Sequence, residues 1–155
     1  MEEYEKNLKE ALKHLQIADH MIYVTFPIIN EYRLLLKIFD EIYFSVINSI
    51  DAILNYEYLY KRIRIYSNNN DNLDTFFRIA KNYGISNEQI KKIREIINHN
   101  KKHKQSAIEF VKKDRVIIMN DNLSIQILDI ITTKQYLLLA KELLMIIRKK
   151  FLVLS

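Results

Sequence analysis

The sequence predicts an all-α protein, a four- to five-helix bundle with a small β-hairpin before the last helix. Apolar side chains recur at steps of three and four residues over most of the chain, which is the spacing of one helix face. The 155 residues include one glycine and one proline, too few for the tight turns of an all-β fold. With 49% apolar residues, residues 1–155 can bury one core and are expected to form a single domain.

Two long helices are predicted in the first half of the chain. Apolar residues at helical spacing from residue 3 to about residue 24 indicate the first helix. Pro27 disfavours the α conformation at Phe26, so we expect this helix to end or turn sharply there. A second apolar stripe starts at Leu34 and runs to residue 54 or on to Ile63, which predicts one long helix, straight or bent.

Two shorter helices are predicted in the middle of the chain. Residues 67–72 are Ser, Asn and Asp, whose short polar side chains compete for backbone hydrogen bonds, so they predict a loop. The helix that follows should stop at Gly84, because a left-handed residue commonly closes a helix. Ser86 and Gln89 have the spacing of a capping box, which starts the next helix. That helix is expected to end between residues 99 and 105.

The spacing of apolar residues changes in the last third of the chain. Residues 115–128 contain two runs of β-branched side chains on either side of an Asn-Asp-Asn turn, which predicts the hairpin. Thr132 and Gln135 offer a second capping box, and the last helix is predicted to run to about Phe151. Its apolar residues cover more than one face, so this helix is either central in the bundle or partly buried in a partner subunit.

The most distinctive stretch is a cationic segment, residues 91–115. It holds nine lysines and arginines against three acids, a net charge of +6, while the whole chain is +5. One concentrated cationic segment on a nearly neutral body predicts an anionic partner, either RNA or an acidic protein. Residues 56–66 add tyrosines interleaved with Lys and Arg, a composition that suits stacking on exposed bases. The residues predicted to contact nucleic acid are Lys91, Lys92, Lys101, Lys102, His103, Lys104, Lys112, Lys113 and Arg115.

Arg94 and His99 lie late in the predicted bundle with four residues between them. In this Arg-x4-His motif and in its all-α architecture, the chain resembles the HEPN family, whose ribonuclease members carry such a motif. The resemblance implies metal-independent RNA cleavage, with His99 as general acid or base on the ribose 2′-hydroxyl and Arg94 stabilising the charged phosphate. It also implies a site between two subunits. Glu95 stands where the family's nucleases often have Asn, Asp or His.

Helix geometry supports a second interpretation of the same two residues. Residues five apart on a straight helix lie roughly 140° apart around its axis, so Arg94 and His99 would diverge within one chain. Arg94 would then be a surface residue in a local ion pair, and His99 would be a solvated residue at the helix end, where the dipole favours it. Three functions stay open: an RNA-associated binding or adaptor protein that uses residues 91–115, a HEPN-like endoribonuclease, and a protein–protein interaction module without a nucleic-acid role.

Other classes of function are not indicated by the sequence. His99 and His103 have the spacing of paired metal ligands, but two ligands among lysines do not make a metal site, so no metal is predicted. The absence of cysteine excludes disulfides and thiolate chemistry, and without a glycine-rich phosphate loop no cofactor is predicted. We expect a cytoplasmic protein without a membrane span, either a homodimer or bound to a partner protein.

Overall fold

The computed structural model describes the backbone of residues 1–154 and the side chains of residues 1–152. Its three strands form one antiparallel sheet in the order of the sequence. The predicted class, mostly helical with a small sheet before the last helix, is confirmed. In chain order the elements are α1 (Glu3–His20), the π-helical turn η1 (Met21–Thr25), α2 (Phe26–Ile29), α3 (Leu34–Leu59), α4 (Asn69–Ile79), the 3-10 turn η2 (Ala80–Tyr83), α5 (Asn87–Lys104), β1 (Ser106–Lys112), β2 (Arg115–Asn120), β3 (Ile125–Asp129) and α6 (Ile130–Leu154).

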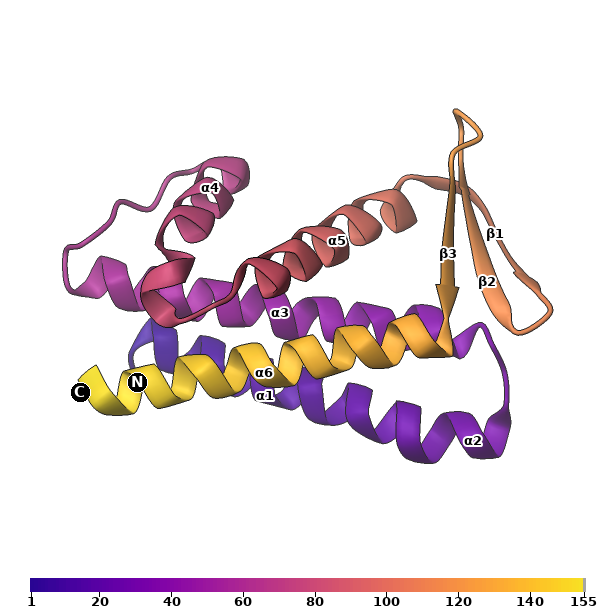
Figure 1. Cartoon of the computed structure of the whole chain (residues 1–155), viewed down its shortest axis with the longest axis horizontal. Coiled ribbons are helices and arrows are strands. Elements are labelled where there is room, and N and C mark those ends of the chain that lie inside the picture. The colour runs from indigo at the N-terminus through magenta and orange to yellow at the C-terminus, as the bar shows by residue number, and fades with distance from the viewer. Residues whose placement is uncertain (155) are drawn as a thin grey trace.

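Three long helices, α1, α3 and α6, run along the long axis of the molecule, and α5 crosses them at an incline (Figure 1). α3 is the central helix, because it contacts α1, α4, α5 and α6. Its Phe39, Ile42 and Val46 are fully buried, and burying each such side chain contributes about 1.5–3 kcal/mol. The short α4 lies near one end of the bundle and the sheet stands at the other (Figure 1).

The expectation that Pro27 ends or sharply turns the first helix is wrong. The chain passes from α1 through the π-helical turn η1 into α2, which carries Pro27 in its first turn. A first turn tolerates proline because its missing N–H would have no helical partner there, and the wider π turn before it relieves the contact with the preceding carbonyl groups. The helical path ends only at Asn30, which is left-handed with φ 53°.

In the middle of the chain, one boundary lies within the predicted range and one differs from the prediction. α3 ends at Leu59, between the two ends considered for it, residue 54 and Ile63. The predicted loop at residues 67–72 is wrong over its last four residues, because α4 begins at Asn69. Asn68 caps that helix by accepting a hydrogen bond from the Asn70 N–H at 2.8 Å, a role for which asparagine is favoured. The asparagine-rich composition therefore marks a helix start as well as a turn.

The predicted start of α5 is confirmed. Gly84 has φ 78° and closes η2. The Gln89 N–H donates to Ser86 Oγ at 3.1 Å, and the Ser86 N–H donates to Gln89 Oε1 at 2.9 Å, so both halves of the capping box are present. α5 then runs to Lys104, within the predicted range.

The sheet has one strand more than the predicted hairpin. The hairpin is β2 and β3, and β1 pairs with the free edge of β2. Val111, Val116 and Leu128 are in register across the three strands and face the helices, which cover Val116 and Leu128 almost completely. β1 breaks the apolar pattern with Glu109 and Lys112, which is why composition alone does not reveal it.

The start of α6 also differs from the prediction, because Thr132 is not its cap. Asp129 Oδ1 accepts a hydrogen bond from the Thr132 N–H at 2.7 Å, and Thr133 Oγ1 donates to the Asp129 carbonyl at 2.6 Å. The helix therefore begins at Ile130, directly after β3. An aspartate accepting from the first-turn N–H groups is equivalent to a serine or threonine cap.

Candidate nucleic-acid interface

α5 positions most of the cationic segment, with one face in the bundle and the other in solvent. Ile93, Ile96 and His99 are fully buried against the core. Arg94 and Lys101 are seven residues apart and both exposed, so they follow each other along one outward face. Since α5 is straight in this region, the two members of the Arg-x4-His motif lie in different environments.

A groove of about 310 Å³ lies between α4 and α5. The Arg94 guanidinium lies over the Phe77 ring, with Cζ 3.7 Å from the ring centroid. A guanidinium over an aromatic face still has N–H donors for an anionic acceptor. The residues that line this α4–α5 groove are Asn70, Leu73, Asp74 and Phe77 from α4 and Arg94, Ile97, Asn98 and Lys101 from α5. The groove therefore combines two cations, two amides and one acid over an apolar floor.

His99 does not line this groove. It is 0% exposed, and its ring lies 4.8 Å from the Phe39 ring and 6.0 Å from the Tyr136 ring, centroid to centroid. Nε2 of Gln126 in β3 lies 3.4 Å from Nδ1 of His99. The other ring nitrogen of His99, Nε2, has no hydrogen-bond partner among the described residues. Burial, reinforced by the nearby charge of His103, lowers the pKa of His99 to about 4. The imidazole is therefore neutral near pH 7 and packed between α3, α6 and the sheet.

His103 lies between two carboxylates instead of facing solvent. Its Nε2 is 3.4 Å from Asp40 Oδ1 of α3, and its Nδ1 bonds Glu109 of β1. The hydrogen bond to Asp40, with a further contribution from Glu109, outweighs burial and raises the pKa of His103 to about 9. The imidazolium thus joins three elements, α3, α5 and β1, and its positive charge is offset within the chain.

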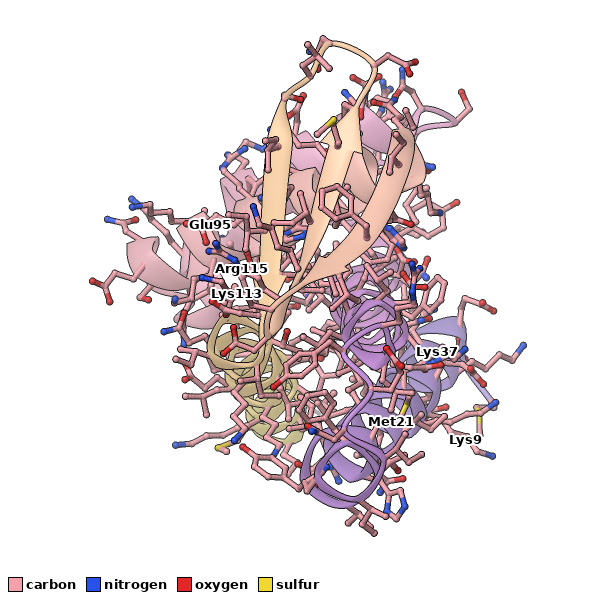
Figure 2. All side chains as sticks on the ribbon, turned by 90° about the vertical axis from the view of Figure 1, so that its right-hand side faces the viewer. Lys9, Met21, Lys37, Glu95, Lys113 and Arg115 are labelled. Carbon is pink, nitrogen blue, oxygen red and sulfur yellow. The ribbon has the colours of Figure 1, made fainter. Side chains whose placement is uncertain are left out.

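The cations after α5 occupy a separate place. Lys112 and Arg115 face each other across the β1–β2 pair, and Lys113 is left-handed with φ 58° in the turn between these strands. Figure 2 shows Lys113 and Arg115 at the lower end of the sheet, on the same side of the molecule as Glu95 of α5. None of these residues lines the α4–α5 groove. The cationic segment is therefore split into a helical part and a turn part.

The remaining lysines of the segment are also dispersed. Lys91 and Lys104 are exposed near the two ends of α5. Lys92 lines a different groove, between α5 and α6, together with Glu88 and Glu142. Lys102 is half-buried on the sheet side of α5, where its carbonyl accepts a hydrogen bond of 3.5 Å from Asn120. Of the predicted nucleic-acid residues, Lys101 is the one that the α4–α5 groove contains.

The tyrosine-rich residues 56–66 are only partly engaged within the chain, because Tyr58, Tyr60 and Tyr66 are exposed. Tyr56 is buried and stacks on Phe151 of α6, with ring centroids 4.1 Å apart. Arg62 forms an ion pair with Glu57. The cavity of about 610 Å³ beside this stretch is lined by Lys61 and by two glutamates, Glu2 and Glu3. The two acids outweigh the one cation, which opposes the binding of a phosphate there.

Sequence reasoning missed Phe77 and the α4 side of the groove. The sequence does contain a signal for Phe77, because Phe76 and Phe77 are neighbours and cannot both face the core from one helix. Phe76 is fully buried, and Phe77 lies half-buried beneath Arg94. That Phe77 meets Arg94 depends on how α4 packs on α5, which no local pattern specifies.

Comparison of the chain with models of protein families, with curated proteins and with solved structures gave no match. The resemblance to the HEPN family therefore stays a prediction. Within the part of the chain that the structure describes, no group of three or more His, Cys, Asp or Glu side chains is placed to hold a metal ion. Of the described helices, none has the length and apolar composition needed to cross a bilayer.

Proposed function

We propose that the protein is an RNA-associated binding protein that engages RNA through the α4–α5 groove and the outward face of α5. The observation that carries this proposal is the Arg94 guanidinium stacked on Phe77 in a groove that also contains Lys101. A guanidinium plane supported by an aromatic ring, a second cation and an apolar floor are elements with which proteins bind unpaired nucleotides.

The groove suits unpaired RNA better than a duplex. Its rim amides, Asn70 and Asn98, carry donors and acceptors that match base edges, while Lys101 and Arg94 match phosphate oxygens. Base edges are accessible to such side chains where the bases are unstacked, in loops and single strands. A stacked base contributes about 1–3 kcal/mol in such sites. The cations of the β1–β2 turn, Lys112 and Lys113, are then available to a strand that extends beyond the groove.

The environment of His99 favours binding over cleavage. A general base must come within hydrogen-bond distance of the proton that it removes. His99 is fully buried and does not line the groove that holds Arg94. Its pKa, lowered to about 4 by burial, also lies well below the neutral range in which a general base works best. Cleavage through Arg94 and His99 would require α5 to leave its packing against α3 and α6.

The experiment is a titration of a labelled single-stranded RNA with the full chain, followed by fluorescence anisotropy at several salt concentrations. Arg94→Gln and Lys101→Gln should each weaken binding about five- to tenfold and lower the salt slope by about one unit, because each removes one phosphate contact. Lys9→Gln is the matched control, since Lys9 is exposed on α1 and Figure 2 shows it on the opposite side of the molecule from Glu95.

Two results would count against the proposal. One is equal loss of affinity in Arg94→Gln and Lys9→Gln, which would mean that net charge alone attracts RNA. The other is RNA cleavage in EDTA that disappears in both Arg94→Gln and His99→Phe, which would establish the metal-independent nuclease instead.

A further inference from the structure

A second apolar stripe runs along the outward face of α6. Ile131, Leu138 and Met145 follow each other at intervals of seven residues and are 66%, 57% and 66% exposed. Leu152 continues the same spacing. The opposite face of the helix supplies core residues such as Leu137 and Ile147. Side chains seven apart stay on nearly one face of a helix, which is the seam by which one helix packs on another.

Grooves flank this stripe on both sides. Leu138 lines the groove between α5 and α6, and Met145 lines a groove of about 440 Å³ between α1 and α6. The change of side follows from helix geometry, because residues at seven-residue spacing drift by about 20° per step on a straight α-helix. α1 and α6 are antiparallel neighbours (Figure 1), and residues of both helices line the second groove.

The α1–α6 groove is apolar with a basic rim. Its floor is aliphatic and contains no aromatic side chain, which gives a nucleotide base nothing to stack on. All of its charged lining residues are cations. The residues that line it are Leu12, Leu15, Lys141, Leu144, Met145, Arg148, Lys149 and Leu152. This combination suits an apolar segment that carries acids beside its apolar face.

The charges do not favour a second copy of the chain as the occupant. If two α6 helices packed antiparallel about a two-fold axis, the α1 sides would meet, and Lys141 and Arg148 would face the same two cations of the other copy. In a parallel pair Lys141 would approach Glu142 of the other copy. Within the chain, however, Lys141 already bonds Asp19 at 2.5 Å, and Glu142 accepts from Gln89 at 2.7 Å.

We propose that the outward stripe of α6 and the α1–α6 groove bind an amphipathic helix of another protein that carries acidic residues on both sides of its apolar face. The seven-residue spacing matches the period of such a helix, and the exposed rim cations Arg148 and Lys149 match its charge, while Lys141 is held by Asp19. The site is independent of the α4–α5 groove, since the two grooves share no residue.

The test uses a fluorescently labelled synthetic peptide of about three heptads with Leu at the seam positions and Glu beside them. A second peptide differs only in having Lys in place of Glu. Anisotropy with the full chain should show the Glu peptide binding at least about tenfold more tightly than the Lys peptide. Met145→Glu should weaken the Glu peptide by at least about tenfold, because it replaces an apolar seam side chain with a carboxylate that repels the acids of the peptide.

The control variant is Ile125→Glu, which makes the same chemical change at a residue that is 54% exposed on the outer face of the sheet. Both variants should keep the helical circular dichroism of the wild type, since both positions are exposed. Unchanged peptide binding in Met145→Glu, or equal affinity for the two peptides, would overturn the proposal. So would a dimer of the wild type in light scattering that Met145→Glu dissociates, or displacement of the peptide by single-stranded RNA.

Discussion

Arg94 and His99 belong to one helix, yet the two faces of α5 place them in opposite environments. Arg94 is exposed and lies 3.7 Å above the Phe77 ring in an open groove. His99 is 0% exposed and packs on Phe39 and Tyr136. The comparison teaches that a short motif does not specify a site, because a five-residue step turns a helix by roughly 140° and sends its two ends to different partners.

The two faces of α5 also differ in what they contribute to the protein. The outward face of α5 presents charge to solvent, while the inward face uses its two histidines to hold neighbouring elements. His99 contributes a neutral aromatic ring, and His103 contributes a cation between Asp40 and Glu109. Variants on the inward face should therefore change stability, and variants on the outward face should change affinity.

The largest expected effect is the loss of stability in His99→Ala. Removing a fully buried ring that contacts two aromatic side chains should lower the free energy of unfolding by about 2–4 kcal/mol. Urea denaturation followed by far-UV circular dichroism measures it. Asn98→Ala, at the neighbouring exposed position, should cost less than about 0.5 kcal/mol. Similar losses in the two variants would mean that α5 does not separate an inward from an outward face.

Acid should destabilise the protein through His99. The pKa of this imidazole is about 4 in the folded chain and near 6.5 when unfolded, so the unfolded state binds the proton first. Stability should fall as the pH decreases from about 6.5 to about 4, by about 3 kcal/mol from this residue. His99→Phe keeps a ring and cannot take up a proton, so its stability should fall less over this range. Parallel curves for the two proteins would contradict this prediction.

Alkali should weaken the structure through His103. Its pKa of about 9 is raised, so the stability that it contributes is fully present below about pH 6.5 and is lost as the pH rises through 9. Because Asp40 is partly exposed and screened by solvent, we expect about 1–2 kcal/mol. His103→Gln should remove this alkaline slope in urea denaturation at pH 7 to 10. His20→Gln, an exposed position on α1, should leave the slope unchanged.

The smallest expected effect is on the outward face. Arg94→Gln loses the stacking on Phe77 and should lower the free energy of unfolding by about 0.5–1 kcal/mol, the range of an exposed cation–π pair. The same urea measurement checks it. A loss as large as that of His99→Ala would show that Arg94 is a structural residue and would weaken its role in binding.

Local patterns in the sequence were sufficient for most of the fold. Gly84 was identified from the backbone freedom of glycine, and the Ser86–Gln89 capping box from side-chain hydrogen bonding. Both signals act within four residues. Pro27 and Asn68 were misjudged because their effect depends on position within a turn: proline is tolerated in the first turn after a π-helical segment, and asparagine caps a helix as well as forming loops.

The candidate site was less predictable for a physical reason. Net charge located the cationic segment, but packing decided which charges are available. The positive charge of His103 is offset by residues from two other elements, Asp40 and Glu109. Lys101 shares a groove with Phe77 of another helix. These pairings join residues that local spacing does not relate, so they depend on how the helices pack.

The most direct test of RNA binding at the α4–α5 groove is an amide chemical-shift map of the isotopically labelled chain during titration with single-stranded RNA. The largest shifts should fall on Leu73, Phe77, Arg94 and Asn98, which line the groove, with little change at Leu138 and Met145 on α6. Shifts centred on α6, or shifts spread evenly over all exposed lysines, would contradict binding at this groove.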